Sequence, residues 1–334
     1  MNVTGTVFTP SPPQLRYLST AQPFYYSPKA HLLDWLPDHY IALAAPLITY
    51  WVASLVFHIL DISEWKWLEK YRIHESAEVK ARNLVTRWQV IRAVILQQIV
   101  QTILGFFWME EKVSGAGIDH VGAMLSLGPF LSRTFNWALG EGTGERIIER
   151  HGAQLLYALY WWAIPTARFF FGMFVIDTWQ YFLHRAMHMN KWLYRQFHSV
   201  HHRLYVPYAF GALYNHPIEG LLLDTLSAGL AEFLSNMSTR EAIALFAISS
   251  LKTVDDHCGY KLPFDPLQFM TSNNADYHDI HHQVSAAAWA DVQVIGIKSN
   301  FSQPFFVHWD AILGTRMTRQ DIEERRQKQQ KKDS

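Results

Sequence analysis

Three long apolar stretches dominate the pattern of hydrophobic and polar positions. Residues 40–60 contain no Asp, Glu, Lys or Arg, and their number matches the ~20 residues that a helix needs to cross the hydrocarbon core of a bilayer. A second uncharged run covers residues 93–109, where three glutamines indicate a face that packs against protein. The third region, 152–176, is interrupted only by Pro165 and Arg168. The pattern therefore predicts three membrane-spanning helices.

Two later segments are apolar but less uniform. Residues 218–235 and 241–256 carry Asp224, Glu232, Lys252 and two further Asp. Charged residues inside apolar helices usually face protein or water rather than lipid. These segments therefore predict a helical hairpin that is sheltered by the rest of the chain.

The connector between the first two spans sets the expected orientation. Residues 61–92 contain a group of basic residues, and the positive-inside tendency assigns such a connector to the cytosol. Counting the spans from there returns residue 184 to the cytosolic face. The basic residues are Lys66, Lys70, Arg72, Lys80, Arg82, Arg87 and Arg92.

Composition supports a membrane protein. Charged residues make up 17% of the chain, compared with about 25% in an ordinary soluble domain, while aromatic residues make up 15%. The mean hydropathy of the whole chain is only -0.04, because it averages the apolar stretches with polar termini and 17 histidines. The expected fold class is all-α, a polytopic membrane helical bundle with a cytosolic histidine-rich helical cap. The alternative is a soluble all-helical protein with buried helices.

The pattern divides the chain into four segments. Residues 1–39 are rich in proline and lack a basic start followed by an apolar run, which predicts an irregular tail without a cleavable signal peptide. Residues 40–150 hold the first spans and their connectors, and residues 151–318 hold the third apolar region and most histidines. Residues 319–334 form a charged tail.

Charge and cysteine content exclude two classes of protein. The formal net charge is zero and no stripe of Lys and Arg alternates with aromatic residues, so a nucleic-acid partner is not expected. The only cysteine, Cys258, excludes an intrachain disulfide framework.

Ten of the 17 histidines fall between residues 184 and 282. Eight of them form one H-x3-H and two H-x2-H-H motifs, so a helix would present each set as a single inward-facing patch. The other two, His216 and His257, lie between the two H-x2-H-H motifs. A mononuclear site takes three or four protein ligands, so ten convergent imidazoles predict two metal ions. The candidate ligands are His184, His188, His198, His201, His202, His216, His257, His278, His281 and His282.

Imidazole ligands suit zinc, copper, iron or nickel, so the ligand type alone does not choose the metal. An all-histidine dinuclear site at a membrane face favours dioxygen activation at iron, because breaking an unactivated C–H bond needs a strong oxidant. Carboxylates close to the ligands in the sequence are candidates to accept the second ring N–H of each imidazole. They are Asp177, Glu219, Asp255, Asp256, Asp276 and Asp279.

At these histidine boxes the sequence resembles the fatty acid hydroxylase superfamily of membrane di-iron enzymes. The sequence also resembles this superfamily at residues 214–219, at residues 257–260, and near the end of the domain at Asn300-Phe301 and Trp309-Asp310. Within the superfamily, residues 192–208 and 252–260 are most similar to the fungal sphinganine C4-hydroxylases.

The resemblance implies a catalytic domain at 151–318, two non-haem iron ions and hydroxylation of a dihydrosphingoid base or ceramide at C4 with O2. It also implies electrons from NADPH through a reductase and cytochrome b5, which must be separate proteins since no haem-binding domain is evident. The end Lys331-Lys332-Asp333-Ser334 resembles the dilysine retrieval signal of endoplasmic reticulum membrane proteins, with the active site facing the cytosol.

Two alternatives stay open at this point. The same scaffold carries sibling reactions, such as sterol C4-methyl oxidation or sterol desaturation. A protein of another class, a non-catalytic membrane metal-binding or transport protein, would place its ligands inside the spans. The sequence leaves open whether the substrate is a free base or a ceramide, which chain length it has, and whether the protein dimerises.

Overall fold

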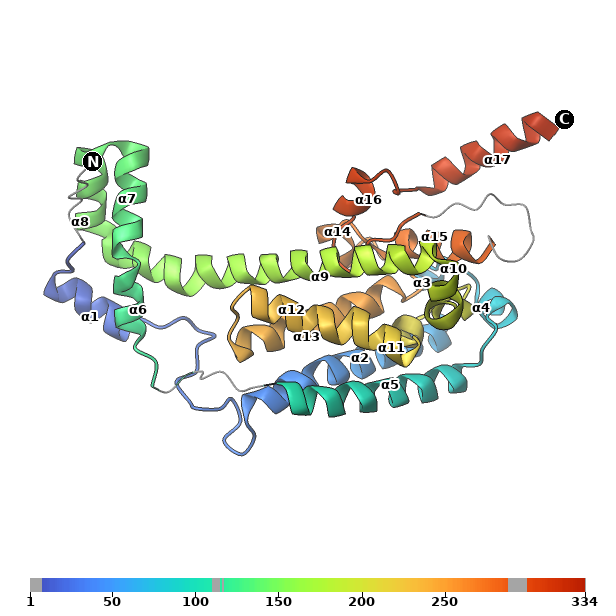
Figure 1. Cartoon of the computed structure of the whole chain (residues 1–334), viewed down its shortest axis with the longest axis horizontal. Coiled ribbons are helices and arrows are strands. Elements are labelled where there is room, and N and C mark those ends of the chain that lie inside the picture. Colours follow the sequence, from blue (N-terminus) through green and yellow to red (C-terminus); the bar gives the residue numbers. More distant parts are fainter. Residues whose placement is uncertain (1–7, 110–114, 116, 288–298, 334) are drawn as a thin grey trace. The chain divides into compact units, whose positions relative to one another are not determined.

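The computed structural model describes residues 8–109, 115, 117–287 and 299–333 (Figure 1). In this part of the chain the regular structure is helical, and β-pairing is limited to the isolated bridges Leu33–Leu36 and Arg72–Tyr260. The α-helices are α1 (Pro12–Thr20), α2 (Asp38–Ser63), α3 (Lys66–Glu69), α4 (Ser76–Arg82), α5 (Arg87–Trp108), α6 (His120–Ser126), α7 (Gly128–Leu139), α8 (Glu141–Ala158), α9 (Ile164–Met189), α10 (Lys191–Leu193), α11 (Pro217–Gly220), α12 (Leu226–Leu234), α13 (Thr239–Asp256), α14 (Pro266–Met270), α15 (Ala275–Ala287), α16 (His308–Ile312) and α17 (Arg319–Asp333).

Short helices of other types join these elements. Three are π-helical, with one more residue per hydrogen-bonded turn than an α-helix, and two are 3₁₀ turns. The π-helical segments are η1 (Leu159–Ala163), η2 (Tyr194–His198) and η5 (Leu221–Thr225), and the 3₁₀ turns are η3 (His201–Arg203) and η4 (Ala209–Leu213).

Three helical stretches have the length and apolar composition of membrane spans, as the hydropathy pattern predicts. They are Asp38–Ser63, Arg87–Trp108 and Glu141–Met189. The last has 49 residues and runs through α8, η1 and α9, so it is longer than the ~20 residues that one crossing needs. The all-α membrane fold is confirmed. The predicted hairpin is helical as well, formed by α11, η5 and α12 on one side and α13 on the other.

The chain forms two compact units, each built from separate stretches. The first unit comprises residues 1–38, 111–171 and 236–241, and the second comprises residues 39–110, 172–235 and 242–334. In the first unit, α7 and α8 pack against each other around a core that includes Met124, Leu131 and Leu156.

The N-terminal segment differs from the irregular tail that its prolines predict. Pro12 and Pro13 occupy the first turn of α1, which follows the N-cap residue Ser11. Proline is tolerated there because the first N–H groups of a helix have no partner within it. Leu18 of this helix is buried in the core of the first unit.

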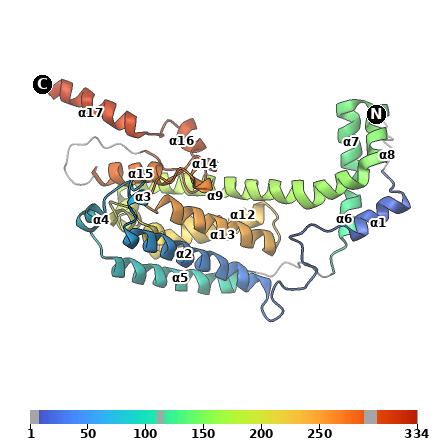
Figure 2. The same ribbon diagram turned by 180° about the vertical axis from the view of Figure 1, so that it is seen from behind.

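The second unit contains the histidine-rich segments. Its α2 and α5 run beside α12 and α13 in both views (Figures 1 and 2). Its core joins Tyr50 of α2 and Val94 of α5 to Tyr208 and Phe210 in the segment after η3, and to Val254 of α13. Because the hydroxyl of Tyr50 donates to the carbonyl of Phe210 at 2.8 Å, this core holds the segment between two histidine boxes against the helices.

A tight reversal of the chain follows α9. The helix ends at Met189, and the side chain of Asn190 accepts hydrogen bonds from the backbone N–H groups of Trp192 and Leu193 at 2.9 and 3.1 Å. Asparagine is a favoured N-cap because its side-chain oxygen satisfies these otherwise unpaired donors. The chain thereby turns directly into η2 and returns the second histidine box to the first.

Candidate metal centre

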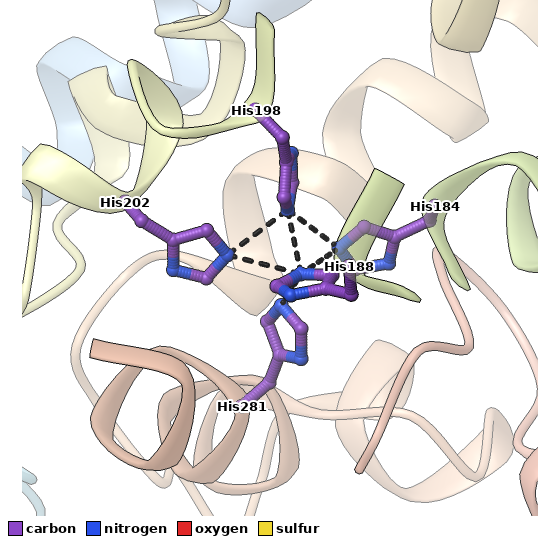
Figure 3. Close-up of side chains that lie close together, drawn as sticks. All are labelled: His184, His188, His198, His202 and His281. Atoms are coloured by element: carbon purple, nitrogen blue, oxygen red, sulfur yellow. Dashed lines mark hydrogen bonds between the residues drawn. The ribbon is translucent and has the colours of Figure 1, made fainter. Parts of the chain in front are cut away.

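Five buried histidines from three parts of the second unit converge on one point. His184 and His188 lie one turn apart on α9, His198 ends η2, His202 lies in η3, and His281 lies on α15. Figure 3 shows their rings pointing toward one another. We call these residues the first group.

The spacing of the Nε2 atoms in the first group fits ligands of one metal ion. The Nε2 atom of His188 lies 2.7 Å from that of His198, 3.1 Å from that of His281 and 3.2 Å from that of His202. With metal–nitrogen bonds of about 2.1 Å, two ligands at a right angle have nitrogens about 3.0 Å apart. Without a cation, lone pairs at such distances would repel one another.

Four further buried histidines form a second group. His201 lies in η3, His257 directly follows α13, and His278 and His282 lie one turn apart on α15. The Nε2 atom of His278 is 3.0 Å from that of His257 and 3.1 Å from that of His282. The ring of His201 lies 4.7 Å from that of His282, centroid to centroid. This group also has the geometry of a metal site.

Each H-x2-H-H box divides between the two groups, whereas the sequence pattern predicts a single patch for each. The first and last histidines of a box join one group, and the middle one joins the other. For the box on α15 the reason is helical geometry, because residues i and i+4 lie about 40° apart around the axis but i+3 and i+4 lie about 100° apart. In the box at 198–202 the chain passes from η2 through a turn into η3, and the division is the same. The prediction of one patch per box is therefore wrong, while the prediction of two metal sites agrees with the two groups.

Backbone carbonyls orient most of the rings. The Nδ1 atom of His184 lies 2.8 Å from the carbonyl oxygen of Phe301, and that of His281 lies 3.0 Å from that of Ser299. A carbonyl oxygen can only accept a hydrogen bond, so the Nδ1 atom that faces it must carry the proton. This tautomer leaves the lone pair of Nε2 free for a metal. In the second group, His201, His257 and His282 have such contacts with Tyr214, Thr253 and Leu204, respectively. Every residue has a backbone carbonyl, so the sequence pattern does not predict which of them orient the rings.

Only one of the six candidate carboxylates contacts a histidine of the two groups. Glu219 on α11 is fully buried, and its Oε1 accepts from Nδ1 of His198. This contact is the outer-shell arrangement that the sequence predicts. Glu219 also reaches back to the N–H of His216 at 3.4 Å, which ties the start of α11 to the site.

The other five carboxylates have different partners. Asp177 accepts from the N–H groups of Phe305 and Phe306, and Asp255 from the amide of Gln268. The remaining contacts are ion pairs or amide hydrogen bonds: Asp256 with Lys252 and Asn273, Asp276 with Lys261 and Arg319, and Asp279 with His74 and Arg319. These residues hold helices and loops around the site, so the structure corrects their predicted role as direct partners of the ligands.

His216 is the one candidate ligand that the structure does not bring to either group. It is half-buried at the N-cap of α11, where its Nδ1 accepts from the N–H of Ile218 at 3.2 Å. Its ring packs edge-on against Phe197, with centroids 5.2 Å apart. The following Pro217 begins a helix, so the backbone at His216 is extended and its side chain caps that helix instead.

Burial keeps the ligands in the form that binds metal. Desolvation lowers the pKa of His257 to about 3 and that of His281 to about 4, because a charged imidazolium loses its hydration inside the protein. Burial likewise raises the pKa of Glu219 to about 7. Neutral imidazoles keep the Nε2 lone pair that a metal requires.

A small cavity adjoins both groups. Its wall includes His201, His257 and His278 of the second group but only His198 of the first, together with the side chain of Asn215. The cavity has a volume of about 20 Å³, room for a water-sized group. Access to the site from this side is therefore mainly to the second group.

Comparison with known proteins agrees with this arrangement. Residues 169–315 match the fatty acid hydroxylase family. The chain is 46% identical to the sphingolipid C4-hydroxylase SUR2 of Saccharomyces cerevisiae over 86% of its own length and 74% of that protein. It is 43% identical to the sphingolipid C4-hydroxylase sur2 of Schizosaccharomyces pombe, covering 86% of this chain and 90% of the relative. No solved structure matches the chain.

A plant relative extends the comparison. Sphinganine C4-monooxygenase 2 of Arabidopsis thaliana is 41% identical over 84% of this chain and 88% of its own length. All three histidine boxes lie within the matched region 169–315. The resemblance drawn from these boxes is thus confirmed, and the chain belongs to the fatty acid hydroxylase family.

Proposed function

We propose that this chain hydroxylates C4 of a dihydrosphingoid base, free or within a ceramide, to give the phytosphingosine type. The observation that carries the proposal is the convergence of nine buried histidines in two groups, in a chain whose relatives over most of its length are named sphingolipid C4-hydroxylases. The reaction balances as R–H plus O2, two electrons and two protons giving R–OH and water.

The nine histidines of the two groups would hold two iron ions, one in each group. Iron bound there supplies the reduction of dioxygen and the oxidation of the C–H bond, which no side chain can perform. The donor set fits this role, because it consists of neutral imidazoles whose Nε2 atoms lie at ligand spacing.

The protein's own groups shape the site around the reaction. Burial of all nine rings excludes bulk water, which protects a reactive site from side reactions. Glu219 and the backbone carbonyls fix the ring orientations. Asn215 and His278 line the cavity, where a polar atom of the substrate has room.

The remaining parts of the proposal concern the protein's surroundings. The electrons come from NADPH through a separate reductase and cytochrome b5. The enzyme is located in the endoplasmic reticulum membrane with its histidines toward the cytosol, as the basic connector between the first two spans favours.

An oxygen-labelling experiment tests the reaction. Detergent-solubilised protein is incubated with 18O2, NADPH, reductase, cytochrome b5 and dihydrosphingosine that carries two deuterium atoms at C4. The expected product contains one 18O atom and has lost one deuterium, as measured by mass spectrometry. Dihydroceramide in a parallel reaction identifies the preferred form of the substrate.

Two results would contradict the proposal. Oxygen incorporation into a methylsterol, with neither sphingolipid substrate altered, would assign the chain to a sibling reaction of the family. Stoichiometric metal without consumption of O2 for any of these lipids would favour the non-catalytic metal-binding protein.

A further inference from the structure

The carbonyls that orient His184 and His281 belong to a segment without regular structure. Residues 299–302 are neither helix nor strand, so no repeating backbone ladder fixes the direction of their carbonyl groups. Ser299 and Phe301 are nonetheless almost completely buried. Hydrogen bonds to other parts of the chain hold these carbonyls in place, and one of them joins the N–H of Asn300 to the carbonyl of Thr315 at 2.9 Å.

Asp310 at the start of α16 supplies most of that support. Its Oδ1 accepts from the N–H of Phe301 at 3.0 Å and from the hydroxyl of Thr315 at 2.6 Å. Its Oδ2 accepts from the N–H of Ser302 at 2.7 Å and from the hydroxyl of Tyr277 at 2.9 Å. The carboxylate is fully buried, and each of its oxygens has two donors.

Asn300 completes the support. Its backbone has a φ of 57°, a left-handed conformation that asparagine tolerates better than most residues. Its side chain donates to the carbonyl of Tyr277 and to that of Met317, and accepts from the N–H of Met317 at 2.7 Å. Asp310 and Asn300 together fix both peptide units next to Phe301.

The carbonyls held by these contacts orient rings of the first group only, although the contacts with Tyr277 also reach α15 next to His278. Oδ2 of Asp310 accepts from the N–H of Ser302, which shares a peptide unit with the carbonyl of Phe301, and that carbonyl accepts from Nδ1 of His184. The carbonyl of Ser299, which accepts from Nδ1 of His281, shares its peptide unit with the N–H of Asn300. That N–H donates to the carbonyl of Thr315, the residue whose hydroxyl donates to Asp310. The carbonyls that orient the second group belong to Leu204, Tyr214 and Thr253. None of these three residues contacts the 299–302 segment through a hydrogen bond in the described part of the chain.

We propose that Asp310 is a positioning residue for the metal held by the first group, acting through the carbonyls of residues 299 and 301. It touches no ligand itself. The inference rests on the proposed assignment of the two groups as metal sites, and it is independent of which lipid the enzyme hydroxylates.

The chain offers a matched control. Asp177 is also a buried carboxylate that accepts two backbone N–H groups of the same loop, from Phe305 at 2.9 Å and Phe306 at 2.8 Å. The carbonyls of these two residues do not accept from any of the nine histidines; that of Phe305 accepts from the N–H of Asn273. Asp177→Asn therefore perturbs the loop without perturbing the orienting carbonyls.

The test measures metal binding rather than turnover. Full-length wild-type, Asp310→Asn and Asp177→Asn proteins are stripped of metal, titrated with Co²⁺ in detergent, and followed by absorption spectroscopy and metal analysis. For Asp310→Asn, we expect one of the two binding steps to weaken about 10-fold, in the range seen when outer-shell partners of a metal site are changed. The other step, and both steps of Asp177→Asn, should stay within about 3-fold of wild type.

Three outcomes would overturn the inference: two unchanged steps in Asp310→Asn, equal weakening of both steps, or the same change in Asp177→Asn. If Asp310→Asn does not fold, Thr315→Val removes one donor from the carboxylate and should weaken the same single step by a smaller factor. An unchanged titration of Thr315→Val would then count against the proposal. If the lipid is not hydroxylated but Asp310→Asn still weakens one metal-binding step, the proposed substrate is refuted and this inference stands.

Discussion

The two histidine groups differ in their number of ligands and in their surroundings. The first has five histidines, three of which are oriented by Glu219 or by the carbonyls of a loop that Asp310 holds. The second has four, and three of them line the cavity. A metal site that reacts keeps an open coordination position, whereas a fully surrounded one does not. An ion in the second group would therefore be the one with room beside it for a further, water-sized ligand.

The largest expected effect comes from removing a ligand from either group. His188→Ala and His278→Ala should each lower hydroxylation by at least about 100-fold, because a ligand matters more than the outer-shell partners whose loss already costs 10- to 100-fold. His216→Ala is the control, since His216 caps α11 outside both groups. Product formation and bound metal measure the effect. If His216→Ala loses as much metal as His278→Ala, the division into five and four ligands is wrong.

A smaller effect is expected for Glu219→Gln. The amide can still contact His198 but no longer stabilises the proton on Nδ1 of that ring as a carboxylate does. Metal affinity of the first group should fall about 10-fold, with the second group unchanged, as measured by titration of the stripped protein. Asp255→Asn serves as the control, because Asp255 is equally buried but contacts Gln268 rather than a histidine of either group. Weakening of both groups by Glu219→Gln would argue against its specific role.

Removal of metal from the wild-type protein should distinguish the two groups by their rates of release. An ion that leaves through the cavity passes three histidines of the second group and one of the first, and a chelator in solution then captures it. We therefore expect the metal to be released in two phases, with the four-histidine site emptied first. Metal analysis of samples taken over time measures this release. Release of both ions in a single phase would mean that the difference in access has no consequence.

The smallest effect is expected at the outer ion pairs of α15. Arg319 is about half exposed and pairs with Asp276 and Asp279, and ion pairs of this kind contribute roughly 0–1 kcal/mol. Arg319→Ala should change the free energy of unfolding by less than about 1 kcal/mol and leave metal content unaltered. Denaturant unfolding and metal analysis measure both quantities. A loss of metal would restore Asp279 as a partner of the site.

The sequence was sufficient for the three long apolar helices and for the nine histidines that converge in the two groups, because hydropathy and histidine spacing are local signals. It was insufficient for the outer partners. Backbone carbonyls such as those of Ser299 and Phe301 carry no side-chain signature, and the roles of Asp177 and Asp310 depend on how a distant loop folds back. His216 was misleading because a histidine before proline can cap a helix as well as bind a metal. Helical geometry, at 100° per residue, accounts for the division of the box on α15, whereas the box at 198–202 lies in η2, a turn and η3.

The divided boxes make the two ions mechanically dependent on each other. His201 and His202 are neighbours in the chain, as are His281 and His282, and in each pair one ring faces each group. Any rotation or sliding of α15 would therefore move ligands of both groups together, whereas a change confined to residues 299–302 or to Glu219 reaches only rings of the first group. The separation of the two groups is thus tied, at two places in the chain, to the fixed length of the peptide unit between neighbouring histidines.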